Sequence, residues 1–275
     1  MGDTVGDQQA IEEIGFLANS ASRVNMLELL READSRRVAK ATFRDRLDCS
    51  RTTIGRNLEA LEERGFIERD HDDVALTRIG EVVAGDFFEL VETVAATRAL
   101  EPFLEWAPPG EFDPPLLWRL ADATMIVATQ ANPYAPEDAH VELMEVTETH
   151  RFALPIVGER GMEASFEMLQ TNDDVSVELI VGPEIAELFD SHPRYREKMQ
   201  RVLRTGQVEV RRSDDEIPYF VGLYDETVHL SVVDEDGRPR ALLETEDDDV
   251  YAWAEDRYRK YRQTADPLEQ VMDPH

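Results

Sequence analysis

The 275-residue sequence contains little cysteine and no long apolar run. Cys49 is the only cysteine, which excludes disulfides within the chain and zinc sites built from several cysteines. No run of about 18 apolar residues occurs, which excludes a membrane-spanning helix. The polar, acidic segment Met1–Gln9 does not have the pattern of a signal peptide. We therefore expect a soluble, cytoplasmic protein with no membrane partner.

Positive charge is also scarce. The 59 acidic residues outnumber the 29 basic ones, which gives a net charge of −30, and only three of the basic residues are lysines. This composition favours a halophilic protein, because at multimolar salt the Debye length falls to about 3 Å and self-repulsion is screened. An ordinary acidic protein is the alternative interpretation. Apolar residues make up 42% of the chain, which is enough for a core.

The charge is unevenly distributed along the chain. Residues 1–85 carry a net charge of −5, whereas residues 86–275 carry −25. Within the first part, Arg36–Arg56 contains seven basic and two acidic residues, a net charge of +5. A positive segment in so acidic a chain indicates an anionic partner at that place.

The first 80 residues have the pattern of several short helices followed by a hairpin. Ser50 is a good N-cap for the last of these helices, and Gly65 is placed to end it. Two short strands, Phe66–Arg69 and Val74–Leu76, flank a polar turn. Helices are predicted over Ile11–Leu17, Ser22–Leu30, Lys40–Leu47 and Arg51–Arg64.

A long helix follows, capped by Thr77 and ending near Leu100. Its apolar residues recur at spacings of four, three and four, which is a narrow seam of the coiled-coil kind and predicts pairing of two copies. Pro102 and the run 107–110 break the chain, so we place a hinge there. The predicted dimerisation residues are Val83, Phe87, Leu90 and Val94.

The remaining sequence alternates strands and helices and predicts an α/β domain with a mixed sheet. The last three strands form a meander, and an amphipathic helix over Val250–Gln263 closes the domain. Strands are predicted over Ala123–Thr129, Arg151–Val157, Val175–Val181, Val208–Arg212, Tyr219–Tyr224, Thr227–Val233 and Arg240–Glu244. Further helices are predicted over Met162–Gln170, Ile185–Phe189 and Tyr195–Leu203.

The helix that follows Ser50 has the two faces of a recognition helix. With Ile54 facing inward, Thr52 and Arg56 point outward in the first half of the helix, where base contacts are usually made. Arg56 is expected to donate hydrogen bonds to the edge of a guanine, whereas Arg69 and His71 of the hairpin are expected to approach an adjacent minor groove. The predicted DNA contacts are Lys40, Arg44, Ser50, Arg51, Thr52, Thr53, Arg56, Asn57, Arg69 and His71.

These residues carry a resemblance to known regulators. The segments 50–53, 58–67 and 76–80 resemble archaeal winged helix-turn-helix transcription regulators of the haloarchaeal type. The remainder, with Asn132–Pro136, Asp234–Gly237 and Trp253–Glu255, resembles the C-terminal domain of the methanogenesis-regulator type. The resemblance implies a DNA-binding dimer with a sensor domain, and it implies no particular effector.

An enzyme in the second domain is not expected. Its strand order loosely resembles half of a phospholipase-D-like fold, with His229, Ser231 and Asp236 near the catalytic places, but the phosphate-binding lysine is missing. His140 and His150 have no matching ligand set, so neither a metal nor a cofactor is expected. Arg151, Arg160 and His229 are the candidate effector-binding residues, with surface ion pairs as the alternative for the arginines. Cys49 is either a redox switch or a buried structural thiol.

These observations predict a sequence-specific transcriptional regulator that binds double-stranded DNA as a homodimer and senses a small molecule. We expect a DNA-binding domain over residues 1–80 and a linker, dimerisation helix and proline-rich hinge over 81–110. A sensor-like α/β domain over 111–265 and a loose tail over 266–275 follow. The alternative is a sensor or degenerate phosphodiesterase-like hydrolase whose winged helix binds protein.

Overall fold

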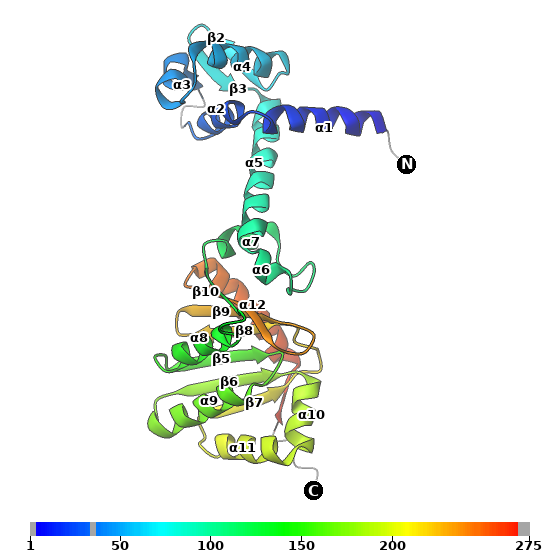
Figure 1. Ribbon diagram of the computed structural model, residues 1–275, viewed down its shortest axis with the longest axis vertical. Coiled ribbons are helices and arrows are strands. Elements are labelled where there is room, and N and C mark those ends of the chain that lie inside the picture. Colours follow the sequence, from blue (N-terminus) through cyan, green and yellow to red (C-terminus); the bar gives the residue numbers. More distant parts are fainter. Residues whose placement is uncertain (1–3, 34–36, 269–275) are drawn as a thin grey trace. The chain divides into compact units, whose positions relative to one another are not determined.

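The computed structural model describes residues 4–33 and 37–268 (Figure 1). The chain divides into two compact units, Met1–Val94 and Ala95–His275, and each unit has its own hydrophobic core. Arg36, part of the predicted basic segment, lies outside the described residues. None of the described helices is both long and apolar enough to cross a membrane.

The first unit contains the predicted helices and hairpin. Its helices are α1 (Thr4–Ala18), α2 (Ala21–Arg31), α3 (Lys40–Arg46), α4 (Arg51–Glu63) and the beginning of α5 (Arg78–Ala99). Its strands are β1 (Arg37–Ala39), β2 (Ile67–Asp70) and β3 (Asp73–Leu76). They form an antiparallel sheet in the order β1-β3-β2. The sequence pattern missed β1, because three residues are too few to show an alternating signal.

The boundaries of these elements follow from local chemistry. Ser50 Oγ accepts a hydrogen bond of 3.1 Å from the backbone N–H of Thr53, which confirms the predicted cap of α4. Gly65 ends the helix with a φ of +72°, a conformation that favours glycine. Thr77 Oγ1 accepts from the N–H of Gly80 at 3.0 Å and caps α5 as predicted. The core between the elements includes the buried side chains of Leu27, Phe43, Ile54, Leu61 and Val74.

The second unit is built on a mixed sheet of eight strands in the order β11-β7-β6-β5-β8-β9-β10-β4, which confirms the predicted mixed α/β domain. Strands β5, β6 and β7 are parallel, and every other neighbouring pair is antiparallel. The strands are β4 (Thr124–Val127), β5 (Thr149–Leu154), β6 (Ser176–Val181), β7 (Val208–Arg212), β8 (Phe220–Tyr224), β9 (Thr227–Val233), β10 (Pro239–Thr245) and β11 (Asp266–Pro267).

Helices cover both faces of this sheet (Figure 1). One face packs against α12 and the short helices α6 and α7 around a core that includes Phe103, Leu120 and Tyr258. The other face packs against α8 to α11 around Phe152 and Phe189. The helices are α6 (Glu101–Leu104), α7 (Pro114–Leu120), α8 (Ala135–Met144), α9 (Glu159–Thr171), α10 (Pro183–Ser191), α11 (Pro193–Leu203) and α12 (Asp248–Thr264).

The structure differs from the expected linker and tail. Phe103 and Phe112, in and beside the expected hinge, are buried in the core of the second unit, because their rings pack edge to face there. The expected loose tail is wrong for its first residues: Asp266–Pro267 pair with β7, and Leu268 is buried. Residues 269–275 of that tail lie outside the described residues.

Candidate nucleic-acid interface

Helix α4 has one buried and one exposed face. Ile54, Leu58 and Leu61 are buried in the core of the first unit, whereas Thr52 and Arg56 are exposed. The two faces are those predicted from the 3.6-residue period of the helix. The exposed face therefore begins with hydroxyl and guanidinium groups, which can donate hydrogen bonds to phosphates or base edges.

Four arginines on α3 and α4 make no ion pair with any described residue. Arg44 only donates from Nε to the carbonyl of Lys40 at 3.3 Å, within its own helix. Elsewhere in the first unit, exposed arginines have carboxylate partners: Arg64 lies 3.1 Å from Glu13, and Arg78 lies 3.1 Å from Glu81. In a chain with two acids for each base, a cluster of unpaired cations is a distinct feature. The four residues, here called the arginine quartet, are Arg44, Arg46, Arg51 and Arg56.

The sequence prediction missed Arg46 of the quartet. It lies in the last turn of α3, one residue beyond Asp45, and its side chain is exposed. The +5 charge of the surrounding segment was the available signal for it. Lys40 was predicted as a phosphate contact, and its Nζ donates to the backbone carbonyl of His71 at the hairpin turn.

Arg69 is not a free cation. Its Nε donates to Glu62 Oε2 at 2.7 Å, and its terminal nitrogen donates to the same oxygen. The hydrogen bond from Arg69 lowers the pKa of Glu62, and the hydrogen bond to Glu62 raises the pKa of Arg69. The guanidinium is therefore held against α4 in a neutral pair.

Asn57, a predicted DNA contact, does not lie on the exposed face of α4. Asn57 is only 8% exposed, because it lies three residues after Ile54 on the face of α4 that packs into the unit. Its Nδ2 is buried without a hydrogen-bond partner among the described residues. Ser50 and Thr53 remain at the surface side of α4, and their hydroxyl oxygens lie 2.9 Å apart at the start of the helix.

The predicted dimerisation seam of α5 is divided between core and surface. Phe87 is only 7% exposed and is not available to a partner, and Val83 is half-buried against the same core. Leu90 and Val94 are 51% and 53% exposed. Ile79 and Val82 are exposed as well and lie on the same side of the helix by the 100° rotation per residue. The exposed apolar seam is therefore Ile79, Val82, Leu90 and Val94.

The three candidate effector residues do not form one site. Arg151 faces α12, where it lies 3.1 Å from Glu255 and 3.0 Å from the Tyr251 hydroxyl. His229 lies on the opposite face of the sheet, beside His140 of α8. Arg160 pairs with Asp138 at the surface.

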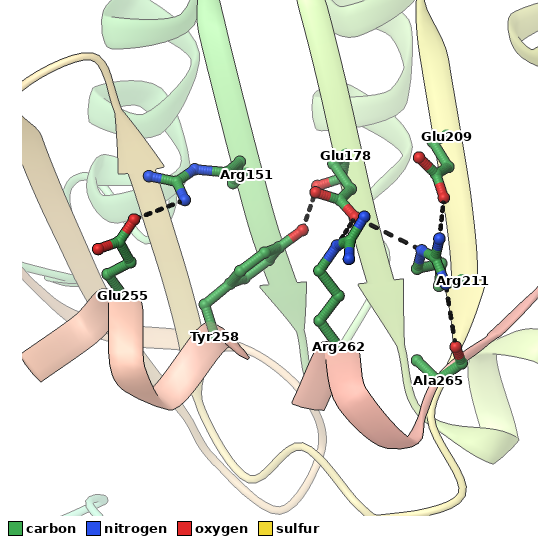
Figure 2. Close-up of polar contacts among 8 residues, drawn as sticks. All are labelled: Arg151, Glu178, Glu209, Arg211, Glu255, Tyr258, Arg262 and Ala265. Atoms are coloured by element: carbon green, nitrogen blue, oxygen red, sulfur yellow. Dashed lines mark hydrogen bonds and ion pairs between the residues drawn. The ribbon is translucent and has the colours of Figure 1, made fainter. Parts of the chain in front are cut away.

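Arg151 belongs to a row of ion pairs between the sheet and α12 (Figure 2). Glu178 accepts from Arg262 and lies 3.5 Å from Arg211 Nε, and Arg211 in turn lies 2.6 Å from Glu209. An open hollow of about 390 Å³ lies along the strand ends here, lined by Arg151, Glu178 and Glu209 among others. Because these arginines already have acidic partners, the hollow offers no spare positive charge.

His229 is fully buried, and its side chain already has a hydrogen-bond partner. Its Nε2 lies 2.7 Å from Glu244 Oε2, and burial lowers its pKa although this hydrogen bond acts to raise it. Ser231, two residues on, donates its hydroxyl to the carbonyl of Ala241. No group of three or more potential metal ligands occurs in the described part of the chain. Cys49 is a free, half-buried thiol that packs against the core of the first unit.

Two family models match the chain. Residues 133–264 match the middle domain of the methanogenesis regulatory protein FilR1. Residues 11–99 match the HVO_A0261 N-terminal domain. Together the two segments span most of the chain. No curated protein matches it.

Several solved structures are similar at low identity. TrmBL2, described as an archaeal chromatin protein with a novel mode of DNA binding, has 14% identity and a TM-score of 0.41, with 90% of this chain and 99% of that one covered. NucT from Helicobacter pylori has 13% identity and a TM-score of 0.42, with 53% and 98% covered. Phosphatidylserine synthase from Haemophilus influenzae Rd KW20 has 17% identity and a TM-score of 0.36, with 52% and 38% covered.

At these scores the structural likenesses assign no role to the chain, and the assignment rests on the family matches. The match over residues 133–264 covers β5 to β10 and all of α8 to α12, which form most of the mixed sheet and most of the helices that cover it. The match over residues 11–99 covers the arginine quartet and the whole of α5. The chain thus carries an N-terminal domain of the HVO_A0261 type over residues 11–99 and a domain of the methanogenesis-regulatory-protein type over residues 133–264.

Proposed function

We propose that this regulator binds double-stranded DNA through the first unit, as a winged helix whose recognition helix is α4. The observation that carries the proposal is the arginine quartet, which has no carboxylate partner among the described residues of a chain of net charge −30. An exposed guanidinium among so many acids finds an ion pair easily, as Arg37, Arg64 and Arg78 do. Four arginines on two adjacent helices that pair with no described carboxylate suit phosphates and guanine edges.

The quartet divides by position between two roles. Arg56 lies on the outer face of α4 with Thr52, one turn into the helix, where it is suited to read a guanine. Arg51 at the first position of α4, and Arg44 and Arg46 at the end of α3, are suited to hold phosphates and set the register.

The exposed apolar seam of α5 supports a homodimer. Four large apolar side chains on one side of a helix are costly in water and are removed from it when a second copy packs there. A two-fold axis would place the same residues of both copies against each other. Two recognition helices related in this way would read a palindromic operator.

The second unit is the proposed sensor, and its effector is a small molecule. The competing hypothesis is a phosphodiesterase-like hydrolase whose first unit binds protein. It is less well supported, because His229 is buried against Glu244 and Ser231 occupies the place of the phosphate-binding lysine.

Selection from a random duplex pool in concentrated potassium chloride tests DNA binding. We expect the wild-type protein to enrich one palindromic motif and Arg56→Ala to enrich none. Arg98→Ala is the matched control, because Arg98 is exposed, pairs with Glu101 and belongs to the second unit, so this variant should enrich the wild-type motif. A folded wild-type protein that enriches nothing, or an Arg56→Ala variant that enriches the same motif, would contradict the proposal.

A further inference from the structure

The hairpin formed by β2 and β3, residues 67–76, carries the charge opposite to that of the arginine quartet. Four of its residues are acidic and only Arg69 is basic. All four carboxylates, on Glu68, Asp70, Asp72 and Asp73, are exposed. We call this hairpin the wing. DNA phosphates placed beside its tip would meet like charges, which is unfavourable.

The arginines near the wing are held in ion pairs. Arg69 is bound to Glu62 of α4, as described above. Arg37 of β1 lies 3.5 Å from Glu68 and 3.7 Å from Asp70, so it only partly offsets the carboxylates of the wing. An arginine that inserts into a minor groove must give up its contacts within the protein. Arg69 would have to break its ion pair with Glu62 to do so.

The tip of the wing offers no other cation that could take the place of Arg69 in a minor groove. His71 has a φ of +52° and an almost fully exposed ring, but its Nδ1 lies 2.7 Å from Asp70 Oδ1. The carbonyl of His71 accepts from Lys40 Nζ, which ties the tip to the start of α3. The imidazole of His71 would therefore bring the carboxylate of Asp70 close to the DNA phosphates.

From this contrast we propose that the wing lies outside the DNA contact and that the regulator reads DNA with α3 and α4 alone. The inference rests on the proposed DNA-binding function and narrows it. The unit is positively charged at the quartet and negatively charged at the wing, so close contact with phosphates is favourable at α3 and α4 and unfavourable at the wing.

This arrangement specifies the class of operator. A side chain in the minor groove distinguishes mainly A·T from G·C pairs, and its binding depends on the width of the groove. Without a wing contact, the base pairs flanking each half-site carry no A/T preference. The recognised sequence is confined to the major-groove bases beneath α4.

Dimethyl sulfate interference on the selected duplex tests the inference, because the reagent methylates guanine N7 in the major groove and adenine N3 in the minor groove. We expect interference at guanine N7 within each half-site and none at adenine N3 in the flanks. Interference at flanking adenine N3, or an A/T-rich flank in the selected motif, overturns the inference and leaves DNA binding intact. Failure of the folded protein to bind any duplex overturns both.

Paired variants give an independent test. Arg69→Gln combined with Glu62→Gln removes the ion pair without changing the net charge, and we expect it to change the affinity by less than about twofold. Arg51→Gln in the quartet should lower affinity about tenfold or more. Equal losses in the two variants would show that Arg69 contacts DNA and would overturn the inference.

The two wing carboxylates without an ion pair in the described structure, Asp72 and Asp73, provide the complementary variant. Asp72→Asn combined with Asp73→Asn should change affinity by less than about twofold in 1 M salt, where charges act over only about 3 Å. A tenfold gain would place these carboxylates against phosphates and contradict the inference.

Discussion

Three histidines surround the ring of Tyr224 inside the second unit. The ring centroids of His140, His150 and His229 lie 5.8, 5.5 and 5.0 Å from that of Tyr224. Burial lowers the pKa of all three, and it lowers that of His140 to about 3. A buried imidazole in this cluster stays neutral in the folded protein at pH values where the unfolded chain binds a proton.

The histidine cluster makes stability depend on pH. Because the folded pKa values lie below the ordinary value of 6.5, the cluster destabilises the fold as the pH falls below about 6.5, by about 1.4 kcal/mol per pH unit for each histidine that stays neutral. His150→Gln should make this dependence less steep. Urea unfolding followed by tryptophan fluorescence reports on it, since all three tryptophans lie in the second unit. The exposed His71→Gln should leave the slope unchanged, and an unchanged slope in His150→Gln would refute the account.

Asn57 leads to a second prediction. Its Nδ2 is buried and unpaired among the described residues, so an apolar side chain of similar volume removes a desolvation cost. We expect Asn57→Leu to stabilise the first unit by about 1 kcal/mol and to leave DNA affinity unchanged, measured by urea unfolding and by titration of the selected duplex. A loss of affinity in a stable variant would restore Asn57 as a DNA contact.

At the scale of elements, the junction between the hairpin and α5 depends on one glycine. A Cβ at Gly80 would lie 1.8 Å from the carbonyl oxygen of Phe66, which is backbone and cannot move aside easily. Gly80→Ala should destabilise the first unit by about 1–3 kcal/mol in urea unfolding followed by circular dichroism. Gly85→Ala, further along α5 with open space around its Cβ, should be neutral or stabilising. Equal stability of both variants would be inconsistent with the close approach.

The seam of α5 predicts the oligomeric state. Leu90→Glu places a charge in the exposed apolar seam and should convert a dimer to a folded monomer in sedimentation velocity. Glu92→Gln is the control, because Glu92 is exposed on the side of the helix away from the seam and the variant should remain dimeric. A dimeric Leu90→Glu protein, or a monomeric wild-type protein, would remove the proposed interface.

Elements with strong local signals were predictable from the sequence, and those without were not. Ser50 and Gly65 defined α4, and the apolar alternation of β7 and β9 gave their bounds as the structure has them. Helices α7 and α8 were not predicted: they are only seven and ten residues long, and each carries a proline in its first turn, where proline is common. The unpaired state of the quartet was not predictable, because it depends on which carboxylates the fold brings near each arginine.

At the scale of the whole molecule, the charge predicts an unusual salt dependence of DNA binding. Each phosphate contact ordinarily contributes about −0.9 to the slope of log K against log salt. Asp45, Glu59 and Glu63 lie on the exposed surfaces of α3 and α4 and can take up cations as DNA binds. We therefore expect a slope shallower than −0.9 for each quartet arginine, measured by fluorescence anisotropy over a range of potassium chloride. A slope of full size would refute cation uptake.

The two-residue strand β11 gives the second unit a protected border. It occupies the outer side of β7, whose backbone would otherwise be open to pairing with another chain. Pro267 has no N–H to offer a further strand, so the sheet cannot easily be extended there. A protein shortened before Asp266 would thus expose the edge of β7 to pairing with another chain, so β11 acts as a guard against fibrous self-assembly.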